Sequence, residues 1–185
     1  MRSIIVIISI LFLTLGACQS PQARRPVKVN SGSFIEASVE RNKKIYDNER
    51  TLFEALIEKD STNDYITSES GFWYYYNTQD SLSIDKMPIL GDAVTFTYNI
   101  NDLDGNVIIS EAENGIQNYL VDQSNQELIS GIREGIKLLK VGESATFLFP
   151  SYKAYGYYGI EKKLGTNIPV TSTITLLSIT QTEEN

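Results

Sequence analysis

A helical period of apolar residues runs from Phe34 to Lys59. Charged residues, among them Glu36, Glu40 and Glu49, occupy the positions around the apolar face. This pattern predicts an amphipathic helix. An apolar stripe is not stable in water, so we expect the helix to pack on its own domain or on a second copy of the chain, and the sequence leaves both open. The stripe consists of Ile35, Val39, Ile45, Tyr46, Leu52, Phe53, Leu56 and Ile57.

Beyond residue 60 the pattern changes to that of strands. Aromatic and β-branched residues alternate with polar ones in short runs, and the Asp-Gly-Asn sequence at 104–106 is typical of a hairpin turn. One helix of two to three turns interrupts them at 130–139. We therefore predict an α+β fold, an antiparallel sheet around one short helix preceded by an N-terminal helix. The predicted strands are 71–76, 93–100, 107–109, 119–121, 144–149 and 173–180.

The amino terminus has the composition of an export signal. An apolar run from Ile4 to Leu15 follows Arg2 and has the length of a signal-peptide core rather than of a membrane-spanning helix. The run ends in Leu15-Gly16-Ala17-Cys18, which resembles the lipoprotein box of bacteria. We expect residues 1–17 to be removed and Cys18 to be lipidated, with 18–33 as a flexible tether. A plain secretory signal is the alternative.

Composition excludes several classes of function. The net charge of −7, from 16 basic and 23 acidic residues, argues against nucleic acid as a partner. The sequence has no histidine and one cysteine, so triad hydrolysis, most zinc chemistry and an internal disulfide are excluded. We expect no metal and no cofactor. The acidic residues that could pair for acid–base catalysis are interpreted as surface charge: Asp102, Asp104, Glu111, Glu113 and Glu143.

Several motifs in the second half of the chain are similar to those of one enzyme family. They are Gly91-Asp92 with Thr95-Phe96-Thr97, the run from Leu128 to Gly135, Val141-Gly142-Glu143, Ala154-Tyr155-Gly156, and Ile168-Pro169. Together they resemble the FKBP-type peptidyl-prolyl isomerases. The resemblance implies an isomerase domain over 71–181, a helical extension over 34–70 and a short tail over 182–185.

The resemblance also implies a binding pocket for proline. Phe96, Tyr155 and Ile129 would be catalytic: an aromatic wall, a hydroxyl that meets a substrate carbonyl, and a backbone N–H that meets the ligand. Ile132 departs from the family, where this position is commonly tryptophan, and Ile109 stands where a carboxylate is usual. These departures imply a wider and less polar pocket. The residues expected to bind substrate are Ile108, Ile109, Leu128, Ile132, Ile168 and Leu176.

The chemistry suits a chain without histidine. Rotation about a prolyl amide meets a barrier of about 18–20 kcal/mol, yet it breaks no covalent bond and needs no proton transfer. The resemblance implies proline-containing polypeptide clients in a bacterial envelope, with the protein anchored through Cys18. Within the family, the chain looks most like the lipoprotein isomerases of Bacteroidetes that are associated with gliding motility. We expect an outer-membrane location facing the periplasm. A non-catalytic chaperone module of the same fold, and a homodimer through 34–59, are open alternatives.

Overall fold

The computed structural model describes residues 31–79, 86–123 and 127–180. The chain divides into two compact units, Met1–Ala37 and Ser38–Asn185. The predicted signal peptide, Cys18, most of the predicted tether and the tail lie outside the described residues. Within the described part, no helix combines the length and the apolar character that crossing a membrane requires.

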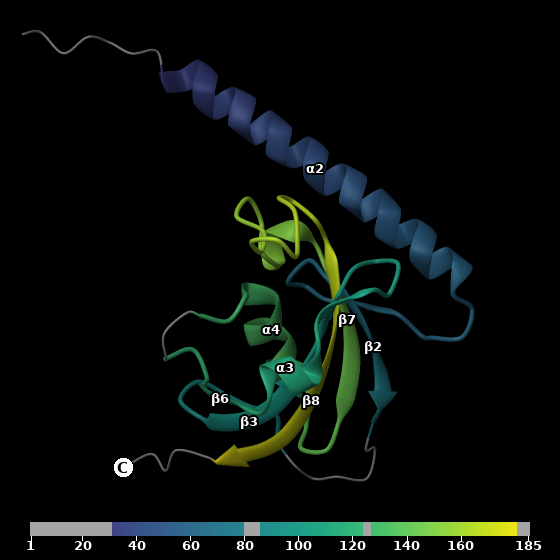
Figure 1. Ribbon diagram of the computed structural model, residues 1–185, viewed down its shortest axis with the longest axis vertical. Helices are drawn as coiled ribbons and strands as arrows, with labels where there is room; N and C mark the ends of the chain where they lie inside the picture. The colour runs from purple at the N-terminus through teal and green to yellow at the C-terminus, as the bar shows by residue number, and fades with distance from the viewer. Residues whose placement is uncertain (1–30, 80–85, 124–126, 181–185) are drawn as a thin grey trace, which may run out of the picture. The chain divides into compact units, whose positions relative to one another are not determined.

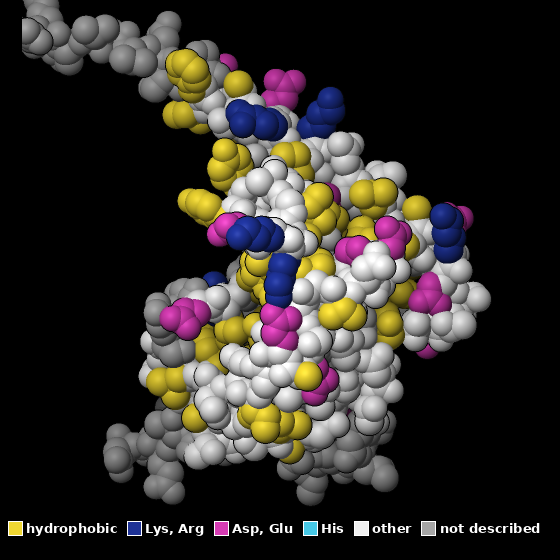
Figure 2. Space-filling view, in the orientation of Figure 1, with side chains coloured by type: hydrophobic (Ala, Val, Ile, Leu, Met, Phe, Trp, Pro, Cys, Tyr) yellow, Lys and Arg dark blue, Asp and Glu magenta, His cyan; other side chains and the backbone are white. Residues whose placement is uncertain are grey.

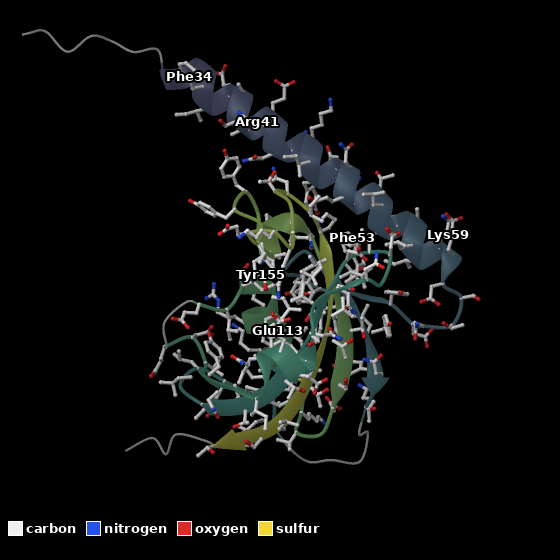
Figure 3. The ribbon with its side chains drawn as sticks, in the orientation of Figure 1. Phe34, Arg41, Phe53, Lys59, Glu113 and Tyr155 are labelled. Atoms are coloured by element: carbon white, nitrogen blue, oxygen red, sulfur yellow. The ribbon has the colours of Figure 1, made fainter. Side chains whose placement is uncertain are left out.

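The predicted N-terminal helix is present as α2, which spans Ser31–Lys59 and begins before the expected start at Phe34. From Ser38 onward it belongs to the larger unit. Phe53 is fully buried, and its ring lies 5.2 Å from that of Trp73, so the helix packs on its own domain there (Figure 3). Burying an aromatic side chain contributes about 1.5–3 kcal/mol, which helps to hold α2 in place.

Not all of the apolar stripe is covered. Phe34, Ile35, Val39 and Leu52 remain exposed, with 53 to 72% of their surface open to solvent. Glu49, expected among the charged residues around the stripe, is 4% exposed and therefore buried. That expectation was wrong because Glu49 lies one helical turn from both Ile45 and Phe53, on the face that packs.

The strands of the described part form one antiparallel sheet in the order β1-β2-β7-β8-β3-β6, with β4 pairing to β8 and to β5. Figure 1 shows β3, β8 and β7 curving around the short helix α4. The predicted α+β fold is thereby confirmed. The strands are β1 (Ile66–Thr67), β2 (Trp73–Thr78), β3 (Ala93–Tyr98), β4 (Ile100–Asn101), β5 (Val107–Ile109), β6 (Gln117–Leu120), β7 (Ser144–Phe149) and β8 (Val170–Thr180).

The predicted short helix is α4 (Ser130–Gly135), which continues as the 3-10 helix η1 (Ile136–Leu138). Ile132 and Ile136 are fully buried against the sheet. A Cβ atom on Gly131 would lie 2.7 Å from the ring of Phe149, so only glycine lets α4 approach β7 this closely. The glycine therefore sets the depth at which the helix sits in the curved sheet.

Two further local features differ from the sequence prediction. A helical turn, α3 (Glu111–Asn114), begins where the Oγ of Ser110 accepts a hydrogen bond from the N–H of Glu113, a helix cap that the sequence pattern did not predict. Glu143, predicted to be surface charge, is 2% exposed, and its carboxylate accepts a hydrogen bond from the N–H of Lys140 at 2.8 Å. Its role is to close the turn before β7. Asp104, Glu111 and Glu113 are exposed, as predicted.

Candidate active site

The loop that carries Tyr155 is held by its own backbone. Pro150 ends β7 and leads into a 3-10 turn, η2 (Ser151–Lys153). The N–H of Gly156 donates to the carbonyl of Ser151 at 2.8 Å, and Gly156 has a positive φ of 52°, which glycine adopts without strain. The N–H of Asn167 donates to the carbonyl of Gly156 at 2.7 Å. These two hydrogen bonds join Gly156 to Ser151 before Tyr155 and to Asn167 further along the chain, and so hold the backbone on both sides of Tyr155.

Two contacts fix the same loop to α4. The ammonium group of Lys153 lies 2.8 Å from both carboxylate oxygens of Glu134, and both side chains are largely buried. The hydroxyl of Ser130 donates to the carbonyl of Lys153 at 3.3 Å. The ion pair is bidentate, and the hydrogen bond reaches the first turn of α4. Together they fix the position of the loop relative to the start of the helix.

Tyr155, labelled in Figure 3, is half-buried against the main apolar cluster, to which Tyr98 at the end of β3 also belongs. Burial raises the pKa of Tyr155 well above its ordinary value, and the neighbouring Tyr98 raises it further. Burial also raises the pKa of Tyr98. Both phenols are therefore neutral at physiological pH, and each is able to donate a hydrogen bond.

The second predicted donor lies at the beginning of α4. Ile129 is the residue immediately before the helix, and the first N–H groups of a helix have no acceptor within it. The guanidinium Nε of Arg133 donates to the carbonyl of Leu128 at 3.2 Å and so fixes the backbone that leads into Ile129. Leu128 and Ile129 both pack against the apolar cluster that holds Tyr155.

The structure places the remaining predicted residues at different degrees of burial. Phe96, Ile132 and Leu176 are fully buried, with no exposed surface. Ile108 and Ile109, on β5, are half-buried against the same cluster. Ile168 lies on the loop after Asn167 and is 39% exposed. The three fully buried side chains lie inside the apolar cluster, whereas Tyr155, Ile129 and Ile109 are only partly buried against it.

Sequence reasoning missed Tyr98. Its ring stacks on that of Phe96 with the centroids 5.9 Å apart, because residues two apart on a strand share a face. Tyr98 thus adds a hydroxyl to the cluster against which Tyr155 packs. The alternation of β3 was the signal that pointed to it. That Phe96 contacts the substrate stays a prediction.

This arrangement brings neutral hydrogen-bond donors to an apolar wall. Among the described residues, no group of His, Cys, Asp and Glu side chains is placed to hold a metal ion. Glu134, the acidic residue that contacts the loop through Lys153, is already engaged in that ion pair. The chemistry available here is the binding of an apolar segment and a hydrogen bond to its carbonyl oxygen, without acid–base catalysis.

A curved antiparallel sheet around a short helix, with a neutral tyrosine at an apolar site, defines a domain suited to binding a peptide amide. The chain belongs to the FKBP-type peptidyl-prolyl cis-trans isomerase family, whose model matches residues 85–177. A relative described as a "probable FKBP-type peptidyl-prolyl cis-trans isomerase FkpA", from Neisseria meningitidis serogroup B, is 33% identical over 127 residues, which are 68% of this chain. Those residues span only 44% of that relative's length.

Solved structures share the fold. A peptidyl-prolyl cis-trans isomerase from Pseudomonas syringae pv. tomato matches with a TM-score of 0.58 and 19% identity, covering 75% of this chain and 96% of that one. FkpA from Escherichia coli matches with a TM-score of 0.57 and 20% identity, covering 96% of this chain and 81% of that one. At these identities the similarity establishes the architecture alone.

Proposed function

We propose that this protein is a peptidyl-prolyl cis-trans isomerase that acts at the site around Tyr155. The observation that carries the proposal is the phenol of Tyr155, which packs against the apolar cluster that contains Tyr98 and stays neutral because burial raises its pKa. Membership of the isomerase family supports the same activity.

The mechanism follows from the physics of the amide. A planar prolyl amide is stabilised by resonance, and twisting it about the C–N bond removes that resonance and much of its polarity. An apolar site favours the less polar twisted form over the planar one, because water no longer stabilises the planar amide. A hydrogen bond from Tyr155 or from the N–H of Ile129 to the carbonyl oxygen would hold the acyl group while the proline ring rotates.

Exchange spectroscopy by NMR tests this activity directly. A short prolyl peptide gives separate signals for its cis and trans forms, which interconvert over roughly 10–100 s without a catalyst. We expect a substoichiometric amount of the protein to produce exchange cross-peaks between them. An unchanged exchange rate at protein concentrations equal to that of the peptide would overturn the proposal.

We further propose that the protein works in the bacterial cell envelope, anchored by a lipidated Cys18 to the outer membrane and facing the periplasm. The lipobox-like Leu15-Gly16-Ala17-Cys18 supports this location. Its clients would be envelope polypeptides that contain proline, with subunits of a gliding-motility and secretion apparatus as one group of them. Growth with an alkyne-labelled fatty acid should label the protein, and Cys18→Ser should abolish the label. An unlabelled wild-type protein would contradict the anchor.

One observation favours a second role for residues 34–59. This segment would either hold unfolded chains or form a homodimer. Phe34, Ile35 and Val39 expose their side chains along α2, and Figure 2 shows hydrophobic side chains at the surface of this helix. Aspartate substitutions at Phe34 and Val39 should reduce suppression of aggregation or dissociate a dimer, measured by light scattering and by sedimentation, while prolyl exchange is retained. Unchanged holding and unchanged mass in this variant would exclude both.

A further inference from the structure

Glu49 is a buried carboxylate whose hydrogen bonds are incomplete. It lies in the second half of α2 and is 4% exposed. One carboxylate oxygen, Oε2, accepts a hydrogen bond from the backbone N–H of Ser151 at 2.9 Å. The other, Oε1, is buried and has no hydrogen-bond partner within the described part of the chain. An unsatisfied buried acceptor is costly, so a donor that reached Oε1 would stabilise the carboxylate.

A cleft lies beside this carboxylate. It has a volume of about 420 Å³ and separates α2 from the loop that follows β7. The rings of Tyr46 and Tyr152 lie 5.9 Å apart on its wall, and the exposed ring of Tyr157 belongs to it as well. Its lining consists of Asn42, Ile45, Tyr46, Glu49, Ser151, Tyr152, Gly156, Tyr157 and Asn167. The cleft therefore combines one carboxylate with several aromatic rings.

We propose that this cleft binds the side chain of an arginine or lysine from a polypeptide. Oε1 of Glu49 requires a donor, and a cationic donor makes the strongest hydrogen bond with a carboxylate. Aromatic rings attract a cation to their faces, which gives Tyr46 and Tyr152 a role in the same recognition. The ammonium group of Lys153 already lies over the Tyr152 ring, 5.8 Å from its centroid, so this ring accepts a cation at its face. Lys153 itself is paired with Glu134. The net charge of −7 also favours a cationic ligand.

The source of the cation is assigned to a polypeptide because the cleft and the Tyr155 site share one loop. Ser151 and Gly156 line the cleft, and Tyr155 between them belongs to the apolar cluster. The hydrogen bond from Asn167 to Gly156 closes that loop. A chain with its proline at Tyr155 would thus have a neighbouring side chain close to the cleft. This part of the inference rests on the proposed isomerase function, whereas binding of the cation does not.

The binding experiment uses the full chain and two probes of equal shape. Nα-acetyl-arginine methylamide and Nα-acetyl-citrulline methylamide differ in one charge, and each is titrated while the amide signals of Ser151 and Gly156 are followed by NMR. We expect saturable shifts with the arginine probe and at least tenfold weaker binding of the citrulline probe. Equal binding of the two probes, or no saturation by arginine, would overturn the proposal.

A pair of variants assigns the effect to one carboxylate. Glu49→Gln keeps an acceptor for the N–H of Ser151 but loses the charge, and its affinity for arginine should fall to that of citrulline. Glu40→Gln makes the same change on the exposed side of α2 and should bind arginine as the wild type does. Arginine affinity retained in Glu49→Gln would contradict the proposal. If this variant does not fold, the two probes on the wild-type protein decide the outcome.

A prolyl peptide tests the polypeptide assignment. The exchange experiment is repeated with peptides that carry arginine or citrulline at increasing distance from the proline. We expect KM to be at least threefold lower for the arginine peptide at one spacing, and equal for both peptides in Glu49→Gln. Equal KM values at every spacing would remove the assignment to a polypeptide. If the protein lacks isomerase activity altogether, the arginine probe still binds, so the two failures can be told apart.

Discussion

Tyr155 and Tyr98 pack in one apolar cluster, although the two come from different elements of the chain. Tyr98 ends β3, and Tyr155 follows the 3-10 turn after β7. Each has a raised pKa because burial disfavours the charged phenolate, and Tyr98 adds to the effect at Tyr155. Two neutral hydroxyls at one apolar site supply donors whose charge does not change over the physiological range.

Tyr155→Phe should slow prolyl isomerisation without unfolding the protein. It removes one hydrogen-bond donor and leaves the ring in the cluster. A hydrogen bond of net worth about 0.5–1.5 kcal/mol predicts a loss of roughly 2- to 12-fold in kcat/KM, measured by NMR exchange. Tyr158→Phe is the matched control, because Tyr158 is on the same loop and is 92% exposed. Equal rates for the two variants would mean that the Tyr155 hydroxyl does not contact substrate.

The isomerase rate should be independent of pH between about 6 and 9. Even an ordinary tyrosine, with a pKa near 10, begins to ionise only at the upper end of this range, so Tyr155 stays neutral throughout it. Ionisation would remove the donor, so the rate should fall only above the raised pKa of Tyr155. The chain has no histidine to titrate near neutrality. Exchange rates on a peptide without ionisable side chains measure the profile. A fall between pH 6 and 8 would show that another group carries the activity.

Gly131→Ala should destabilise the fold by roughly 1–3 kcal/mol, measured by chemical denaturation, because the new Cβ would meet the ring of Phe149 in a packed core. The separation of 2.7 Å between that Cβ and the ring leaves no room for the methyl group. Gly165→Ala is the control, since its Cβ would lie 3.5 Å from Ile168, an ordinary contact. We expect the control to change stability by less than about 0.5 kcal/mol. Equal stability of both variants would contradict the packing of α4 on β7.

Most of the fold follows from periodicity and turn residues. Alternating apolar residues predicted β3 and β7, and the Asp-Gly-Asn turn predicted the hairpin between β4 and β5. The α3 turn escaped prediction because four residues are too few to show a period. The starts of α2 and β8 shifted by about three residues, since tertiary contacts and not local preference fix where an element begins.

The site was harder to predict than the fold. Tyr155 and the start of α4 come from short motifs, whereas Tyr98 depends on which face of β3 meets the loop, and that is a tertiary relationship. Glu49 was missed although its spacing from Ile45 and Phe53 placed it on the buried face. Its charge suggested solvent, and only the position of the Ser151 N–H explains why a carboxylate is tolerated there.

Asp60 should make the protein more stable at neutral pH than in acid. Its carboxylate accepts hydrogen bonds from Thr62, Asn63 and Tyr65 in the turn that follows α2, and these bonds hold its pKa far below the ordinary value. A carboxylate with a lowered pKa in the folded state stabilises the fold above the unfolded pKa of about 3.9, and this stabilisation is lost as the pH falls toward the folded value. Asp60→Asn should therefore lower Tm at pH 7, and the difference from wild type should shrink below pH 4.

Asp64→Asn, on the exposed part of the same turn, should leave Tm unchanged at both pH values. A difference for Asp60→Asn that stays constant from pH 7 to pH 2 would show that its effect is steric and not due to the charge.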